Sequence, residues 1–390
     1  MQGASVELLR DFAELESFRD PWKDLSRHSP PPIASYEEYR DLLCCPANHD
    51  SMHLVVLREN GQIVTLAPFL LSYRKKSYTL GVRRLFSLPI RTLRLMNDCF
   101  IGKRDSEQIR HVFNALVRYN DFDLISFGEH ELEGPFFRSI KSALADSPWR
   151  CVIPFHKVSI HWFIDLPSSF DDYMSGFSAK TRYNLRRELR SFDTKYCGRT
   201  RVVTTGEDVD WFLTIGEQIS RLTYQWNLGQ RIRCDESSRR EYLSHAEARR
   251  LRCYILFAGE QACAFGRGTI KDGVYNYERV GFDPRYEKAS PGTVLLLRVI
   301  EDLIVNTDCR ILDFGSGGDY KKIFGNRSYE VVSLEVGRRW SFYPMLLFGI
   351  QDALNLSKRC GNAVLGEGRL KKLIKRRLKK YGTRPSQTNL

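Results

Sequence analysis

Two short segments in the second half of the chain combine residue types and spacings that could do chemistry. The first is GFDPRYEKASPG, residues 281–292, a polar stretch between a strand-like apolar run and a helix-like apolar run. Proline suits the first turn of a helix and glycine lets a ligand approach the backbone, so Pro291-Gly292 should open the helix. A helix start offers unpaired N–H groups and a positive dipole end, which suit a diphosphate. We therefore expect an anion site at Arg285, Lys288, Ser290, Pro291, Gly292 and Thr293; the alternative is an ordinary strand-to-helix loop.

The second segment is CRILDFGSGGDYKKIFGN, residues 309–326. Its ILDFGSGG run is similar to the first motif of S-adenosylmethionine methyltransferases. That fold needs several βα units after the motif, whereas fewer than about 80 residues remain here. The methyltransferase interpretation is therefore the weaker alternative for this segment. Asp313-Phe314-Gly315 is expected to end a strand beside the anion-binding helix, and Asp319-Tyr320-Lys321 to start a short helix.

The two segments together resemble the CelD-like acetyltransferase domain of the GNAT superfamily. The shared pattern is G-x-D-x-x-Y, S-P-G, D-F-G-x-G and Y-K-x-x-F, in that order, and the resemblance covers Phe170 to Val336. A more distant similarity links the chain to Fem-type aminoacyl transferases, which are tandem GNAT proteins. The residues that carry the pattern are Gly281, Asp283, Tyr286, Ser290, Pro291, Gly292, Asp313, Phe314, Gly315, Gly317, Tyr320, Lys321 and Phe324.

The resemblance implies an acyl-CoA donor, with acetyl-CoA as the first expectation, and no metal. In GNAT enzymes the strands before and after the phosphate-binding helix splay apart, and the gap receives the pantetheine arm. Gly315 and Lys321 then join the six anion-site residues as expected donor-binding residues. One feature departs from the family: Lys288-Ala-Ser-Pro-Gly292 replaces the usual Q/R-x-x-G-x-G/A loop. Fewer glycines allow fewer close backbone contacts to a phosphate.

The resemblance also suggests catalytic roles. Tyr320 stands where GNAT enzymes often place the tyrosine that protonates the leaving thiolate, and a structural tyrosine is the alternative. Glu278, on the preceding strand, and Asp319 are candidate general bases. A surface pair between Glu278 and Arg279 is the alternative for the former. Further polar residues are expected to have structural roles: Asp283 and Asp313 in fixing loops, and His156 and His161 as fold or surface residues.

The order of the expected elements repeats along the chain. Residues 53–71 and 252–270 each read as a β-hairpin with a glycine-containing turn. Each hairpin is followed by an apolar helix, at 109–119 and 293–305, and then by a buried strand, at 122–127 and 310–314. We therefore expect an α/β protein of tandem GNAT-like halves, each with a mixed, mostly antiparallel sheet, splayed central strands and flanking helices. The expected domains are an N-terminal half (1–160), a donor-binding domain (161–340) and a helical, basic extension (341–390).

Composition limits the class of protein and its partners. The formal charge of +13 and the pI of about 9.3 favour acidic partners. The ten cysteines show no C-x-x-C or zinc-like spacing, so we expect buried, reduced thiols and no metal. The charged N-terminal residues do not read as a secretory signal, and no run is apolar enough to span a bilayer. These features favour a cytoplasmic protein.

The extreme C-terminal segment has its own pattern. Arg369–Lys380 contains eight lysines or arginines and no acid, with Leu370, Leu373, Ile374 and Leu378 on one helical face. We expect an amphipathic cationic helix that could contact the inner, anionic membrane surface, and a solvated tail is the alternative.

The leading functional hypothesis is an N- or O-acyltransferase. Its acceptor would be a small molecule or a glycan in polysaccharide synthesis, an expectation that rests on the resemblance alone. Acyl carrier protein or charged transfer RNA are alternative donors, and no other nucleic acid is expected as a partner. A non-catalytic binding protein on a GNAT fold is the hypothesis from a different class.

Overall fold

The computed structural model describes the chain except residues 1–3, 30–34, 45–50, 81–82, 146, 153–157, 224–225, 227–230, 319 and 366–390. The described residues form two compact units. The first unit comprises residues 1–159 and 330–390, and the second comprises residues 160–329. None of the helices that the structure describes combines the length and hydrophobicity required to span a bilayer.

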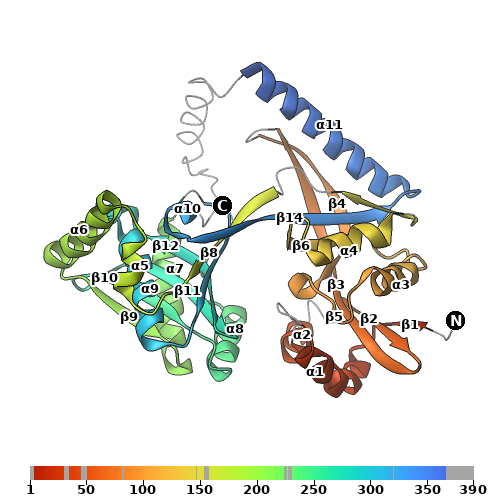
Figure 1. The fold of residues 1–390 in the computed structure, drawn as a ribbon, viewed down its shortest axis with the longest axis horizontal. Coiled ribbons are helices and arrows are strands. Elements are labelled where there is room, and N and C mark those ends of the chain that lie inside the picture. The colour runs from red at the N-terminus through yellow and green to blue at the C-terminus, as the bar shows by residue number, and fades with distance from the viewer. Residues whose placement is uncertain are drawn as a thin grey trace, which may run out of the picture. The chain divides into compact units, whose positions relative to one another are not determined.

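The first unit contains a mixed sheet with the strand order β1-β2-β3-β4-β6-β14, with β5 beside β3 and β7 beside β14 (Figure 1). All of its pairings are antiparallel except that of β4 with β6. The strands are β1 (Ala4–Leu9), β2 (Met52–Glu59), β3 (Gln62–Leu80), β4 (Arg83–Leu95), β5 (Ile101–Gly102), β6 (Leu124–Glu131), β7 (Trp149–Val152) and β14 (Arg327–Arg338).

Helices cover both faces of this first sheet because its strands are apolar on both faces. In β2, Val55 packs in the core with Ile109 and Phe113 of α3, whereas Leu54 packs in a second core with Trp22 of α1. The helices are α1 (Arg19–Arg27), α2 (Tyr36–Leu43), α3 (Ser106–Leu116), α4 (Pro135–Leu144) and α11 (Phe342–Leu365).

The second unit contains a sheet with the strand order β8-β13-β12-β11-β10-β9. Again one pairing is parallel, that of β12 with β13, and the others are antiparallel. The strands are β8 (Val158–Asp165), β9 (Arg199–Val203), β10 (Cys253–Ala258), β11 (Gln261–Lys271), β12 (Val274–Phe282) and β13 (Ile311–Ser316). The helices are α5 (Phe170–Ser175), α6 (Ala179–Tyr196), α7 (Val209–Leu222), α8 (Glu236–Glu247), α9 (Pro291–Asn306) and α10 (Lys321–Phe324).

Side chains alternate between the two faces of the second sheet, as the pleat requires. Tyr275 and Tyr277 of β12 belong to the core under α9, together with Leu295. Cys253 and Ile255 of β10 belong to the opposite core, under α7 and α8. Helix α9 is buried nearly all round, which explains the uninterrupted apolar run after Pro291-Gly292.

The two sets of elements follow the same order along the chain. Apart from the two-residue strand β5 between β4 and α3, the first runs β1-α1-α2-β2-β3-β4-α3-β6-α4, and the second runs β9-α7-α8-β10-β11-β12-α9-β13-α10. In each set the single parallel pair flanks one helix, α3 or α9. The predicted fold class, tandem GNAT-like halves with mixed sheets, is therefore confirmed.

The strand that follows each set of elements along the chain pairs with strands of the other set. β8 follows the first set but pairs with β13 in the second unit. β14 follows the second set but pairs with β6 and β7 in the first unit. The sequence analysis placed residues up to 340 in the donor-binding domain, whereas the structure places Glu330 onward in the first unit, because these residues pair there.

Candidate functional site

The strands that flank α9 separate part-way along their length. β12 and β13 pair only through Val274–Asn276 and Ile311–Asp313. Beyond that point the described residues of β12 pair with β11, and Gly315 and Ser316 of β13 pair with β8. This confirms the predicted splay: among the described residues, β12 beyond Asn276 has no strand partner on the β13 side, and we call the space between the two diverging strands the gap. Extended amide groups in such a gap can pair with the amides of a bound chain.

The start of α9 borders this gap and has the expected geometry of an anion site. Ser290 is in the left-handed conformation (φ 51°, ψ 47°), and Pro291 is the first helical residue. The Val294 N–H donates to the Ser290 carbonyl, 3.0 Å away, so the helical ladder begins there. The N–H groups of Gly292 and Thr293 lie in the first turn, where a helix supplies no acceptor. A Cβ at Gly292 would meet only Phe282, at 3.6 Å, so internal packing does not require this glycine.

The charges around the helix start are partly compensated. The Arg285 guanidinium turns back onto the buried Asp283 carboxylate, with N–O distances of 2.8 and 2.6 Å. Hydrogen bonds from Arg285 hold the pKa of Asp283 below its usual value. Asp283 also accepts the Arg285 N–H at 2.9 Å, which agrees with its expected role in fixing the loop. Arg285 is therefore a weaker anion ligand than its position in the sequence suggests, whereas Lys288 is exposed.

A carboxylate that the sequence analysis did not single out also lies at this helix start. The Glu188 carboxylate of α6 lies near the Ser290 side chain, and burial raises its pKa by more than this contact lowers it. A negative charge there stabilises the helix dipole itself and therefore competes with a bound anion. No sequence pattern indicates that Glu188 lies here, because it stands in a segment dominated by basic residues.

Lys321 stabilises the end of β13. Its Nζ atom donates to the carbonyls of Phe314 and Ser316, the latter at 2.8 Å. Gly315 has a positive φ of 66°, which favours glycine, and its N–H donates to Asp313 Oδ1 at 2.6 Å. Asp313 thus has the loop-fixing role expected of it. These contacts hold the splayed end of β13 in place.

Tyr320 lies beside the gap and is 39% exposed. Its ring contacts Phe314 edge-to-face, with centroids 6.2 Å apart, and Phe314 contacts the buried Tyr277 in the same way at 6.0 Å. Burial raises the pKa of Tyr277 well above its usual value, with the charge of a neighbouring Tyr320 phenolate as a smaller cause. Asp319, the residue before Tyr320, lies outside the described residues, as does His156.

Glu278 is engaged in contacts within the second unit. Thr269 donates to Glu278 Oε1 at 2.9 Å, and Arg267 Nε lies 3.2 Å from Glu278 Oε2. The Arg267 side chain is 4% exposed and also pairs with Glu241 at 2.6 Å. The alternative pairing of Glu278 with Arg279 is not found, because the Arg279 guanidinium donates to the Arg231 carbonyl. Each carboxylate oxygen of Glu278 therefore already has a partner within the second unit.

A histidine–carboxylate pair lies where the strands separate. His161 Nε2 is 2.6 Å from Asp313 Oδ1, and the imidazole forms a three-ring cluster with Phe163 and Tyr329, whose own centroids are 5.1 Å apart. His161 and Asp313 alternate with residues of the core under α9, so they face the side of the sheet on which Glu278 lies. The sequence analysis treated His161 as a fold or surface residue. No sequence signal links two residues 152 positions apart.

Three cysteines of the second unit are poor candidates for a nucleophile. Cys253, Cys263 and Cys309 are buried, as expected, and burial raises the pKa of the first two to about 12. In the described part of the chain no three His, Cys, Asp or Glu residues are arranged to hold a metal ion.

The comparison with protein families decides the assignment of this region. Residues 179–322 match the profile of the acetyltransferase (GNAT) domain family. This segment therefore has the sequence pattern of a GNAT domain. The matched range contains the splayed strands β12 and β13, helix α9 and Tyr320. The family match and the candidate site therefore fall on the same part of the second unit.

Solved structures extend the similarity to both sets of elements. A tandem GNAT protein from the clavulanic acid biosynthesis pathway is 13% identical, with a TM-score of 0.51, covering 86% of this chain and 98% of that one. The C-terminal domain of a putative lysylphosphatidylglycerol synthetase from Agrobacterium fabrum is 13% identical, with a TM-score of 0.50 and coverages of 86% and 95%. FemX is 10% identical, with a TM-score of 0.50 and coverages of 81% and 95%. These matches establish a shared fold, and the predicted Fem-like similarity is confirmed. No curated protein matches the sequence significantly.

Proposed function

We propose that this protein transfers an acyl group from a thioester donor to an amine or hydroxyl acceptor, at the gap between β12 and β13. The observation that carries the proposal is the separation of these strands after Asn276 and Asp313, beside the open first turn of α9. The exposed edge of β12 suits the amides of a pantetheine arm. The first turn of α9 suits a phosphate.

Acyl-CoA is the first candidate donor, and acetyl-CoA its simplest form. Its diphosphate would contact Ser290, Pro291, Gly292 and Thr293 at the helix start, with charge from Lys288. Arg285 and Lys321 are also proposed donor contacts, although both already have protein partners. Gly315 would let the arm pass close to the end of β13.

A macromolecular donor is the second candidate, and Glu188 favours it. A carrier protein or a charged transfer RNA brings no CoA diphosphate to the helix start, so the carboxylate at Ser290 would oppose it less. The pI of about 9.3 would attract either acidic macromolecule. Binding that weakens steeply with salt would distinguish such a donor from free CoA.

The proposed reaction is direct transfer. A base removes a proton from the acceptor, the acceptor attacks the thioester carbonyl, and the tetrahedral intermediate expels a thiolate, which then takes up a proton. We assign the final protonation to Tyr320. Candidate bases are Glu278, Asp319 and His161, of which His161 has a carboxylate partner suited to orienting it.

The acceptor and location complete the proposal. The resemblance to CelD-like domains favours a glycan or sugar acceptor in polysaccharide synthesis. We propose a cytoplasmic protein that reaches the inner face of the membrane through Arg369–Lys380, a segment outside the described residues. A non-catalytic GNAT-fold binding protein is the competing proposal, because the phosphate loop departs from the family pattern.

Thermal unfolding with acetyl-CoA, longer acyl-CoAs, free CoA and an acyl carrier protein tests the proposal. A donor at 100 times its Kd should stabilise the fold by about 2.7 kcal/mol. Gly292→Gln should abolish the shift by filling the helix start, and Gly349→Gln, at an uncrowded helical glycine, should not. A chain that responds to no thioester donor would favour a charged transfer RNA as donor or the non-catalytic binding protein.

A further inference from the structure

Helix α11 carries apolar residues on two faces. One face packs into the first unit, where Leu347 and Phe348 contact Tyr78, Ile90 and Leu124. The other face is exposed and follows a heptad spacing of Phe342, Leu346, Gly349, Ala353 and Leu356. Phe342 is 81% exposed and Leu356 is 64% exposed, and Trp340, just before the helix, is 90% exposed. Large aromatic and aliphatic side chains grouped in this way indicate a surface that contacts something other than water.

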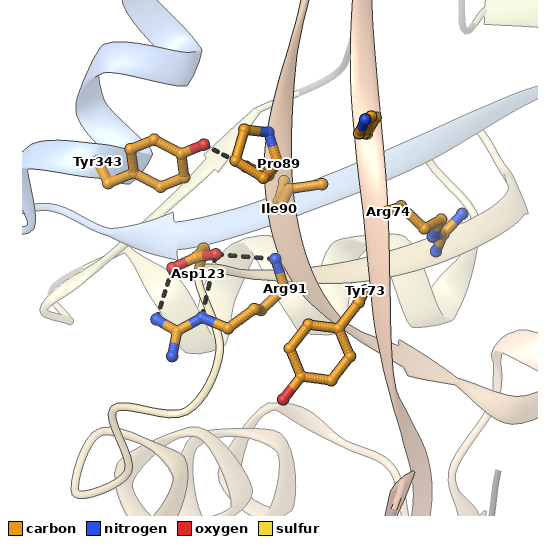
Figure 2. A pocket seen from close by; sticks show the side chains of 8 residues that line it. Tyr73, Arg74, Pro89, Ile90, Arg91, Asp123 and Tyr343 are labelled. Carbon is orange, nitrogen blue, oxygen red and sulfur yellow. Dashed lines mark hydrogen bonds and ion pairs between the residues drawn. The ribbon is translucent and has the colours of Figure 1, made fainter. Parts of the chain in front are cut away.

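A cavity of about 620 Å³ lies beside the start of this helix, and Tyr343, the neighbour of Phe342, lines it (Figure 2). Its walls are mixed, with apolar contributions from Pro89 and Ile90 and cationic ones from Arg74 and Lys75. Tyr343 donates to the Pro89 carbonyl, which fixes the start of α11 against β4. The cavity therefore adjoins the exposed apolar face.

The positive charge of this cavity is only partly compensated. Arg91 forms an ion pair with Asp123 at 2.8 Å, and Asp123 also accepts the Arg91 N–H at 2.8 Å. Figure 2 shows Arg74 pointing away from that pair. Among the described residues, Arg74 and Lys75 form no ion pair. Burial and the charge of Arg94 lower the pKa of Arg74, and the nearby charge of Glu335 offsets this only in part.

We propose that this face of the first unit docks on an anionic phospholipid bilayer. Trp340, Phe342 and Leu346 enter the interfacial layer, and Arg74 and Lys75 contact lipid phosphates at the cavity. Tryptophan and phenylalanine favour the headgroup boundary, and lysine and arginine are attracted to an anionic leaflet.

The positive charge around the exposed face of α11 favours an anionic bilayer, rather than a second copy of the chain, as its partner. A second copy brings the same unpaired cations and a net charge of +13, so it offers no complementary surface. The chain also continues from α11 into Arg369–Lys380, with eight further cations and no acid. Two signals, one apolar and one cationic, are what stable peripheral binding needs. This inference does not depend on acyl transfer.

Sedimentation of the full chain with lipid vesicles tests the proposal. Wild-type protein should sediment with phosphatidylcholine vesicles that contain phosphatidylglycerol, and much less with phosphatidylcholine alone. Arg74→Gln/Lys75→Gln should weaken binding to anionic vesicles by about 25-fold, since each basic residue near the surface contributes about fivefold. Trp340→Ala/Phe342→Ala should weaken binding by about tenfold or more. All of these variants keep the C-terminal cations.

Matched variants control for general effects. Arg138→Gln/Lys141→Gln removes the same charge from exposed positions of α4, and Val305→Ala shortens an exposed apolar residue of α9. Both should bind vesicles as the wild type does. Bromine-labelled lipids should quench the fluorescence of the wild type more than that of Trp340→Phe, which places Trp340 at the lipid.

Three results would overturn the proposal. The first is a wild type that remains in the supernatant with anionic vesicles. The second is sedimentation that is equal for the wild type and both test variants. The third is a wild-type dimer that Trp340→Ala/Phe342→Ala converts to a monomer, which would assign the apolar face to a second copy.

Discussion

His161 Nε2 lies 2.6 Å from Asp313 Oδ1, at the point where β12 and β13 separate. The same Asp313 oxygen accepts the N–H of Gly315, so the carboxylate is fixed on two sides. His161 lies on β8, which follows the first set of elements along the chain but pairs with β13 in the second unit. The pairing of β8 with β13 thus gives the second unit a histidine that lies outside residues 179–322, the range matched by the GNAT family.

The first prediction concerns this pair. His161→Gln should lower donor-dependent thiol release by about 100-fold, because a positioned general base contributes about 10²–10⁴-fold. Asp313→Asn should lower it too, since the carboxylate orients the imidazole. Steady-state rates over a pH series measure both effects, and the acidic limb of the wild-type profile should disappear in His161→Gln. Donor affinity should stay unchanged.

His111→Gln is the control for the first prediction, since His111 is a partly exposed histidine of α3. A purely structural role for His161 would appear as reduced thermal stability in His161→Gln with normal turnover and an unchanged pH profile.

The second prediction concerns Glu188 at the start of α9. Glu188→Gln removes a negative charge beside Ser290, so CoA should bind about 5- to 10-fold more tightly, the effect of roughly 1 kcal/mol at a helix terminus. Burial raises the pKa of Glu188, so its protonated fraction at a mildly acidic pH exceeds that of an ordinary glutamate. Wild-type affinity for CoA should therefore rise as the pH falls, and the affinity of Glu188→Gln should rise less.

Isothermal titration of CoA measures this difference. Glu301→Gln, an exposed position of α9, makes the same change in charge and should leave affinity within about twofold, because exposed charges are largely screened. Equal or weaker CoA binding by Glu188→Gln would show that the carboxylate does not oppose the donor.

The third prediction concerns the buried cation between α8 and β12. Arg267 is 4% exposed and contacts Glu241 and Glu278. Arg267→Ala leaves these carboxylates without their shared partner and should lower the free energy of unfolding by about 3 kcal/mol. Urea denaturation measures the loss. Arg279→Ala, on the same sheet, should change stability by less than about 0.5 kcal/mol, because that side chain is exposed. Similar losses for the two variants would contradict the prediction.

Local sequence patterns were sufficient to predict much of the second unit. The apolar run predicted as a helix at 293–305 is α9, at 291–306, and the predicted hairpin at 252–270 is β10 and β11. These elements depend on periodicity and on turn residues, both of which are local. The splay was expected from the family resemblance, and the observed pairing confirms it.

The remaining features depend on contacts that local patterns do not encode. β8 and β14 each read as ordinary strands, and the choice of partner strand is made between residues more than 100 positions apart. The charge at the start of α9 also depends on such contacts. Glu188 stands among basic residues in the sequence but lies near Ser290, and the Arg285 guanidinium is paired with Asp283. Charge counted along the sequence therefore overestimated the positive potential at the helix start.

The last prediction separates a catalytic from a structural role for Tyr320. If its hydroxyl protonates the leaving thiolate, Tyr320→Phe should slow thiol release from acetyl-CoA by about 100-fold, within the usual range for a general acid. In an acetyl thioester of an aromatic thiol, the leaving group is a stable thiolate that needs no proton. The variant should therefore use this donor almost as well as the wild type does. Tyr183→Phe, at an exposed tyrosine of α6, should behave as the wild type with both donors. A loss of the same size with both donors would mean that Tyr320 only supports Phe314 and the end of β13.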